Sequence, residues 1–292
     1  MEASSRRAYR ALQRSGAPPP AKKPSRAGRN LPAAIGVGVV LGGAVIATAL
    51  LWAPSFVALV TVAIVLASLE MVTALRAGRF NVPVVPVIAG AALVPVAYAY
   101  GSSMLILGYG LVCLAILLWR AVEGPERAIR DIAGGVLIVT YVPLLAAFAA
   151  LMIAAPDGGQ RIIVFALVTT MSDTGGYAMG VLKGKHPMAP SISPKKSWEG
   201  FGGSVLFSVV AGAISVPLLL GGHWWAGALL GLPVAVFATV GDLAESTIKR
   251  DLGIKDMGNL LPGHGGVMDR LDSLLITAPL LWLLLGVLVP VA

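Results

Sequence analysis

Charged residues are scarce in this chain of 292 residues, because Asp, Glu, Lys and Arg together make up only 12% of it. In soluble domains about a quarter of the residues are charged, so this low fraction excludes an ordinary soluble globular protein. Hydrophobic residues reach 57%, and the mean hydropathy is +0.85. The composition therefore predicts an integral membrane protein.

Cysteine is almost absent as well. The one cysteine, Cys113, lies in the apolar run "LVCLAILL" and has no metal-binding residue beside it in the sequence. A single cysteine cannot form an internal disulfide, which excludes a disulfide scaffold. We interpret Cys113 as a packing residue in the core or facing lipid.

Acidic residues are nearly missing from the first 29 residues, which hold eight Lys and Arg against Glu2 alone. This segment has no apolar stretch, so it cannot be a signal peptide, and we predict a basic disordered cytoplasmic tail over residues 1–30. Beside a membrane helix such charge orients the chain and attracts anionic membrane lipids. We expect no nucleic-acid partner.

Long apolar runs dominate the remainder of the chain. A spanning helix needs about 20 apolar residues, and nine runs come near that length, at 31–52, 54–75, 82–100, 103–121, 132–155, 161–183, 201–221, 224–248 and 272–290. The predicted fold class is an all-α polytopic membrane protein with about nine transmembrane helices. We divide them into N-terminal transmembrane helices, 31–155, and a C-terminal transmembrane catalytic region, 156–292.

Basic residues in the loops predict the orientation, because cytoplasmic loops carry an excess of Lys and Arg. With the basic tail inside, the loops 76–79, 120–131, 183–200 and 245–272 are also inside, and Arg161 is the only basic residue of the outer loops. We therefore expect a multi-pass protein of the cell (inner) membrane. Its N-terminus is expected in the cytoplasm and its C-terminus on the outer side.

The first polar cluster follows the eighth apolar run. Asp242, Glu245, Ser246 and Lys249 are spaced 0, 3, 4 and 7, which places them on one helical stripe. A solvated face on a helix leaving the membrane would explain Lys249 and the adjacent basic residue, but Asp242 lies about two turns deeper. An intramembrane carboxylate is a functional-site hypothesis by default.

The second cluster is "LPGHGGVMDRLDS", residues 261–273, just before the last apolar run. Gly265 and Gly266 would allow backbone N–H groups to approach an anion. Asp269 and Asp272 fall on one face of the helix that follows, where carboxylates are also favourable simply as N-terminal residues. Facing Asp242, with Lys and Arg nearby, the two carboxylates indicate a Mg²⁺ and polyphosphate site.

The third cluster spans the sixth run and its loop. Asp173 lies near the middle of an apolar segment, and the loop carries the pair Lys195 and Lys196. A satisfied buried Asp and a purely topological lysine pair are the simpler readings. Glu70 and Arg120, at helix ends or in loops, are interpreted as topological.

Two of these segments resemble a known family. "STIKRDLGIKDMGNLLPGHGGVMDRLD", residues 246–272, resembles the signature S-x-x-K-R-x4-K-D-x5-P-x-H-G-G-x-x-D-R-x-D of phosphatidate cytidylyltransferases (CDP-diacylglycerol synthases), with every fixed position filled. "SDTGGYAMGVLKGKHPMAPSISPKKSWEG" is similar to the family's second recurring segment. There Gly176 stands where Ala is common, and Ser197 stands where Thr is common.

The resemblance implies that CTP and phosphatidic acid give CDP-diacylglycerol and pyrophosphate, in phospholipid biosynthesis, with Mg²⁺ and a second cation such as K⁺. It also implies a nine-span homodimer, and the family's metal-binding aspartates map onto Asp242 and Asp269. We expect a polar cavity at the cytoplasmic side. The further catalytic candidates are Lys249, Arg250, His264 and Arg270, and the substrate-binding candidates are Ser246, Lys255, Lys195, Lys196, Gly265, Gly266, Asp173 and Asp272.

Two alternatives remain at the level of sequence. A CTP-dependent polyprenol or phytol-type lipid kinase would also use membrane-embedded acidic and basic residues, but such kinases lack the complete run described above. A cation-coupled transporter would explain Asp173 and Asp242 as part of an ion pathway. A transporter needs polar residues distributed across the bilayer, whereas these are expected on the cytoplasmic side.

Overall fold

The computed structural model describes residues 31–258, 260 and 265–290, and the described chain is almost entirely helical. The helices are α2 (Leu31–Leu51), α3 (Ala53–Ala77), α4 (Val84–Ala89), the 3₁₀ turn η1 (Gly90–Ala92), α5 (Leu93–Glu123), α6 (Ala128–Val139), the π-helical turn η2 (Thr140–Leu144), α7 (Leu145–Ile153), α8 (Gly158–Lys183), α9 (Trp198–Leu220), α10 (Trp224–Asp251) and α11 (Met268–Leu288). Two short antiparallel strands, β1 (Pro187–Ala189) and β2 (Ser193–Ser197), form a hairpin between α8 and α9.

Seven helices within the described residues are long and apolar enough to cross a membrane. This confirms the all-α polytopic class, while the number of nine spans stays a prediction. The helix Leu31–Leu51, which covers the first predicted run, is 21 residues long and contains no charged residue. The unit Val84–Glu123, which counts once among the seven, covers the predicted runs 82–100 and 103–121 over 40 residues.

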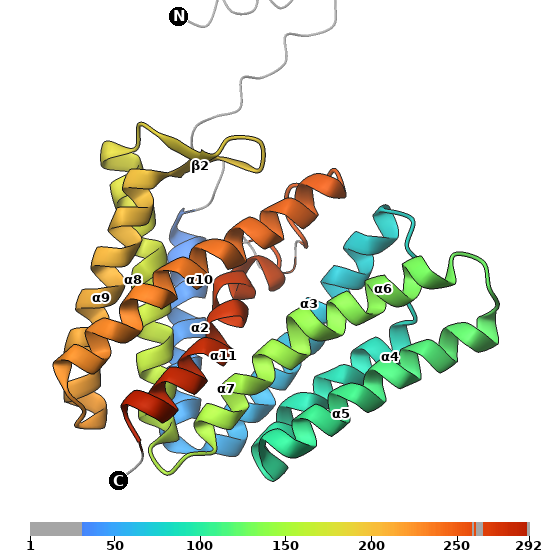
Figure 1. Cartoon of the computed structure of the whole chain (residues 1–292), viewed down its shortest axis with the longest axis horizontal. Helices are drawn as coiled ribbons and strands as arrows, with labels where there is room; N and C mark the ends of the chain where they lie inside the picture. The colour runs from blue at the N-terminus through green and yellow to red at the C-terminus, as the bar shows by residue number, and fades with distance from the viewer. Residues whose placement is uncertain (1–30, 259, 261–264, 291–292) are drawn as a thin grey trace, which may run out of the picture.

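This unit of 40 residues bends back on itself at Gly101. Gly101 has φ 77° and ψ −168°, a non-helical conformation that glycine adopts without steric cost. A Cβ atom at Gly108 would lie 3.0 Å from Leu93 Cδ2, although 15 residues of straight helix would separate the two positions by about 22 Å. The predicted runs 82–100 and 103–121 therefore lie on the two limbs of a helical hairpin (Figure 1).

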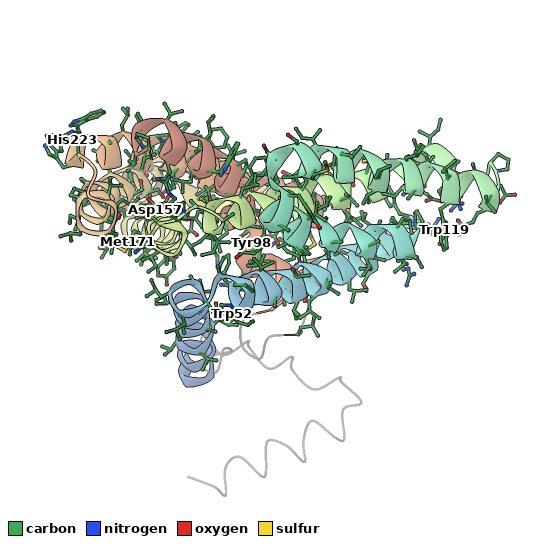
Figure 2. All side chains as sticks on the ribbon, turned by 90° about the horizontal axis from the view of Figure 1, so that it is seen from below. Trp52, Tyr98, Trp119, Asp157, Met171 and His223 are labelled. Carbon is green, nitrogen blue, oxygen red and sulfur yellow. The ribbon has the colours of Figure 1, made fainter. Side chains whose placement is uncertain are left out.

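The loops segregate to two ends of the molecule. The β hairpin, the end of α10 and the start of α11 lie in the upper part of Figure 1, and the C-terminal end lies in the lower part. Figure 2 shows α2 leaning away from the other helices, with Trp52 where it joins α3. The three helices α8, α10 and α11 contact one another, so polar residues on them can meet near the upper end.

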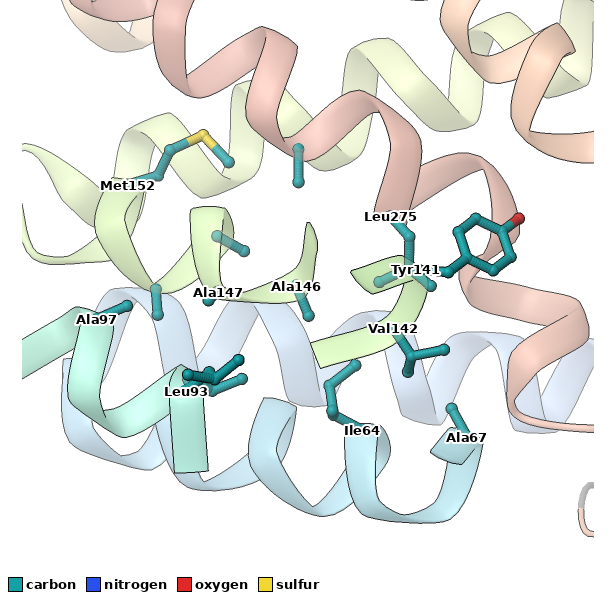
Figure 3. Packing of buried hydrophobic residues seen from close by; sticks show 14 of the residues in the cluster. Ile64, Ala67, Leu93, Ala97, Tyr141, Val142, Ala146, Ala147, Met152 and Leu275 are labelled. Carbon is teal, nitrogen blue, oxygen red and sulfur yellow. The ribbon is translucent and has the colours of Figure 1, made fainter. Parts of the chain in front are cut away.

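A π-helical turn interrupts the helical segment 128–153 in the core. Pro143 lies inside this turn and has no N–H to donate to the helix, which accounts for the irregular hydrogen bonding there. Tyr141 of the same turn is buried near Leu275 of α11 (Figure 3). Its hydroxyl lies 3.4 Å from the carbonyl oxygen of Gly241 in α10. The turn thus connects the N-terminal helices to the helix that carries Asp242.

Close backbone contacts join α8, α9 and α10. A Cβ atom at Gly175 would lie 2.5 Å from the Gly203 carbonyl oxygen, and one at Gly212 would overlap the Gly227 carbonyl. Membrane helices use small residues in this way, because close approach increases van der Waals contact where lipid offers no hydrophobic driving force. These contacts hold the three helices at short range.

We expect Gly212→Ala to destabilise the protein by about 1–3 kcal/mol, because the added methyl group would force α9 and α10 apart. The matched control is Gly202→Ala on the same helix, where a Cβ atom would meet nothing within 4 Å. Thermal unfolding of both variants in detergent measures the difference. Equal unfolding midpoints would show that the α9–α10 contact contributes nothing to stability.

Candidate active site

Five carboxylates gather near the upper end of three helices. They are Asp173 of α8, Asp242 and Glu245 of α10, and Asp269 and Asp272 of α11. Carboxylates are costly within a membrane protein unless they are hydrogen-bonded, paired with cations or bound to metal. Their partners therefore indicate how the site is organised.

Ser273 of α11 links the carboxylates of the other two helices. Its Oγ lies 2.8 Å from Asp242 Oδ1 and 3.4 Å from Asp173 Oδ1, and the side chain is buried. A hydroxyl group donates a single proton, so the shorter contact, to Asp242, is the stronger hydrogen bond. This serine joins α8, α10 and α11 at one point.

Lys196 supplies a cation to the same point from the β hairpin. Its Nζ lies 2.5 Å from Asp242 Oδ2 and 3.3 Å from the Thr239 carbonyl oxygen. Both charged side chains are partly accessible, at 24% for Lys196 and 30% for Asp242. The pair is therefore reachable by a substrate while remaining partly shielded from water.

The start of α9 holds the hairpin in place. Glu199 Oε2 accepts hydrogen bonds from the backbone N–H groups of Lys185 and His186, at 3.1 and 3.2 Å. Its Oε1 lies 2.5 Å from His186 Nδ1. Ser197 caps α9 by accepting a hydrogen bond from the Gly200 N–H at 3.1 Å. These contacts explain why "SPKKSWEG" forms an ordered loop that can aim Lys196.

The two lysines of this loop differ in their surroundings, and substitution should separate them. We expect Lys196→Met to lower kcat by about 10²-fold, because it removes the cation beside Asp242. Lys195 is exposed and has no ion pair within the described residues, so Lys195→Met is the matched control, with an expected change below about threefold. Steady-state kinetics of both variants tests this, and equal losses would contradict the assignment of Lys196 alone.

A second ionic group lies beside the first. Lys249 Nζ pairs with Glu245 and lies 3.0 Å from Asp269 Oδ1. Asp269 Oδ2 also accepts hydrogen bonds from the backbone N–H groups of Gly266 at 2.8 Å and Met257 at 3.1 Å. Asp269 thus lies in the first turn of α11, where a negative charge is favourable. Lys249 and the two backbone donors fix its orientation.

Asp272 connects the two groups, because it is close enough to interact electrostatically with both Asp242 and Glu245. Within the part of the chain that the structure describes, the five carboxylates are directly paired with two lysines, Lys196 and Lys249. Arg270 is exposed, but it is close enough to Asp173 to interact with it electrostatically. The cluster therefore carries more acidic than basic groups.

The other predicted residues are less closely involved. Arg250 donates from Nε to the Ile192 carbonyl oxygen at 3.2 Å, which ties the end of α10 to the hairpin. Ser246 is half-buried and Lys255 is exposed, and neither has a hydrogen bond or ion pair to the five carboxylates within the described residues. Gly265 has φ +86°, as a glycine turn requires, and His264 lies outside the described residues.

Sequence analysis missed four residues at this site. Ser273 carries no motif, Tyr141 lies in a distant apolar run, and Glu245 was placed on the stripe without a role. The interpretation of Glu70 as topological is wrong, because its buried carboxylate accepts a hydrogen bond from the Met268 N–H at the start of α11. Only the helical spacing of Glu245 from Lys249 could have indicated one of them.

Comparison with known proteins places these residues in context. Residues 32–288 match the cytidylyltransferase family. The chain is 42% identical to phosphatidate cytidylyltransferase of Mycobacterium leprae over 285 residues, which covers 91% of each chain. It is 41% identical to the protein of the same name from Mycobacterium bovis over 283 residues, covering 92% of each chain. A third, from Staphylococcus epidermidis, is 43% identical over 129 residues, or 44% of this chain and 50% of its own length.

Proposed function

The chain belongs to the cytidylyltransferase family, and on that basis we propose that it makes CDP-diacylglycerol and pyrophosphate from CTP and phosphatidic acid, a step of phospholipid biosynthesis. It is a membrane-embedded nucleotidyltransferase. The observation that carries this proposal is the cluster of five carboxylates with Lys196 and Lys249, assembled from α8, α10, α11 and the β hairpin. The cluster lies within the segment that matches the family.

The reaction requires charge neutralisation more than proton transfer. A phosphate oxygen of phosphatidic acid is already anionic at neutral pH, and it attacks the α-phosphorus of CTP. The bond from that phosphorus to the α–β bridging oxygen breaks, and pyrophosphate leaves with the electron pair. Because two polyanions must meet, catalysis depends on cationic groups that align and neutralise the phosphates. Lys196 and Lys249 are the described cations held closest to the carboxylates.

The excess of carboxylates fits a divalent cation. Within the described residues no three acidic, His or Cys side chains are arranged to ligate one ion. Mg²⁺ needs fewer protein ligands, since it typically takes one or two carboxylates and completes its shell with phosphate oxygens and water. Asp242 and Asp269 would hold it, with Asp272 as a further acidic neighbour. When bound, Mg²⁺ supplies positive charge that stabilises the developing charge on the phosphates.

The chain's own residues then have separate tasks. Ser273 fixes Asp242 at 2.8 Å, and Glu245 holds the ammonium group of Lys249 toward Asp269. Lys196, Arg250, Lys255 and Arg270 are proposed to bind the phosphates of CTP, with the exposed Lys195 beside them in the sequence. His264, outside the described residues, stays a candidate for contacting the leaving pyrophosphate. Asp173 completes the acidic side of the cluster. A second cation such as K⁺ is proposed from the family resemblance alone.

The membrane location suits both substrates. Phosphatidic acid keeps its acyl chains in the bilayer, while CTP arrives from water, so a site near one end of the helices serves both. We propose that this end faces the cytoplasm, with the N-terminus on the same side and the C-terminus on the outer side of the cell membrane. We further propose that the protein acts as a homodimer, as expected from the family resemblance.

Label transfer in detergent tests the reaction. Purified protein is mixed with phosphatidic acid, Mg²⁺ and CTP labelled at the α-phosphate, and label is followed into the lipid phase. We expect the label to enter lipid and the transfer to stop with EDTA. Lipid labelled only from γ-labelled CTP would indicate a kinase, and ion-driven uptake in proteoliposomes without a lipid product would indicate a transporter.

A further inference from the structure

Glu70 is a buried acidic residue in the last third of the apolar helix α3, Ala53–Ala77. The residue is only 5% exposed, although α3 contributes none of the five carboxylates of the site. A buried carboxylate is costly unless its oxygens are bonded. Within the described residues Oε2 has a hydrogen-bond partner, whereas the buried Oε1 has none.

The partner is the segment that leads into α11. Glu70 Oε2 accepts a hydrogen bond from the Met268 N–H at 2.9 Å, at the first residue of that helix. A carboxylate at this position also complements the positive end of the helix dipole. The contact joins residues 198 positions apart in the sequence.

Two glycines close around the same carboxylate. A Cβ atom at Gly266 would lie 2.6 Å from Glu70 Oε2, and one at Gly258 would overlap Oε1. Only residues without a side chain can approach the carboxylate so closely. Gly258 and Gly266 are thus both held against Glu70, one on each side of the intervening segment.

The neighbours of these glycines orient Asp269. The N–H of Gly266 donates to Asp269 Oδ2 at 2.8 Å, and the N–H of Met257, adjacent to Gly258, donates to the same oxygen at 3.1 Å. One donor thus belongs to Gly266, which packs on Glu70, and the other belongs to the residue before Gly258, which also packs on Glu70. Displacing them would release Asp269 from its position 3.0 Å from Lys249.

We propose that Glu70 is a positioning residue for cytidylyl transfer, which holds Gly258, Gly266 and the start of α11 so that Asp269 meets Lys249. The inference rests on the proposed function. Glu70 acts through the protein backbone and touches neither substrate. Its role is to link an N-terminal helix to the geometry of the site.

Replacement of Glu70 tests this role. Glu70→Ala should lower kcat by about 10- to 100-fold, the range for residues that orient site ligands. Glu70→Gln keeps an oxygen that can accept from the Met268 N–H, so it should recover most of the loss. Glu126 is exposed in the loop between α5 and α6, and Glu126→Ala and Glu126→Gln are the matched controls, expected to resemble the wild type.

A second measurement separates positioning from stability. Hydrogen exchange in residues 265–272 should become faster in Glu70→Ala, while residues 198–220 stay unchanged, and kcat is measured well below the unfolding midpoint. A lower midpoint with unchanged kcat and unchanged exchange would overturn the proposal. A wild-type enzyme without product would instead refute the proposed function, which distinguishes the two failures.

A double substitution examines the contact itself. Gly258→Ala should reduce kcat, because its methyl group would overlap the Glu70 carboxylate. In the Glu70→Ala background that overlap is gone, so the double variant should be no less active than Glu70→Ala alone. Losses that multiply would show that Gly258 and Glu70 act independently, and would overturn the proposed contact.

Discussion

Replacing Asp269 by Asn should reduce kcat by about 10³-fold, or about 4 kcal/mol of transition-state stabilisation. Asn has nearly the same shape but no charge, so it cannot balance Lys249, 3.0 Å away, or hold a divalent cation as a carboxylate does. One of its terminal atoms becomes a donor facing backbone N–H groups that now donate to Asp269. Label transfer from α-labelled CTP into lipid measures the effect.

The control for this substitution is Asp251→Asn, which changes an exposed aspartate at the end of α10. We expect it to retain activity within about threefold, as is usual for surface charges. Both variants should elute as the wild type in size-exclusion chromatography. An Asp269→Asn enzyme with activity within tenfold of the wild type would remove Asp269 from the metal and phosphate site.

Substitution of Lys249 should have an equally large effect, on stability as well as on activity. Lys249→Met leaves Glu245 without its cation, and the Glu245 side chain is only 2% exposed. Breaking such a buried pair costs about 3–5 kcal/mol, so the unfolding midpoint should fall clearly. Activity should fall by about 10³-fold, because a cation next to Asp269 is also lost. The exposed residue Lys183, changed to Met, is the control.

A paired substitution separates the two losses. Glu245→Gln with Lys249→Met removes both charges, so no buried charge remains unpaired and the midpoint should recover most of its loss. Activity should stay low, because the ammonium group beside Asp269 is still missing. Recovery of activity together with stability would mean that Lys249 only balances Glu245 and does not act on the phosphates.

The sequence predicted those parts of the site that depend on local spacing. Asp242 and Lys249 lie seven residues apart on one helix, so their periodicity was enough to group them. Asp269 lies in the first turn of the next helix and was expected to face them. The apolar runs also predicted the membrane class, which the helices confirm. The metal assignment to Asp242 and Asp269 and the homodimer stay predictions.

Other parts depend on contacts that no local pattern encodes. Ser273 meets Asp173 from 100 residues away, and Glu70 meets Met268 from 198 residues away. The sequence cannot distinguish Lys195 from Lys196, because both are lysines in the same loop. Successive side chains of a strand point to opposite faces, and in β2 it is Lys196 that reaches Asp242. Run lengths also do not show that the helical unit Val84–Glu123 reverses at Gly101.

The serine that joins three helices also sets an order of events during biosynthesis. Ribosomes add about 5–20 residues per second, so Ser273 is made roughly 5–20 s after Asp173, which precedes it by 100 residues. Until the last helix is inserted, Asp173 and Asp242 lack their common hydroxyl partner within the membrane. Nascent chains that stop before this helix therefore lack the hydroxyl group that joins Asp173 and Asp242, although Lys196 can still pair with Asp242.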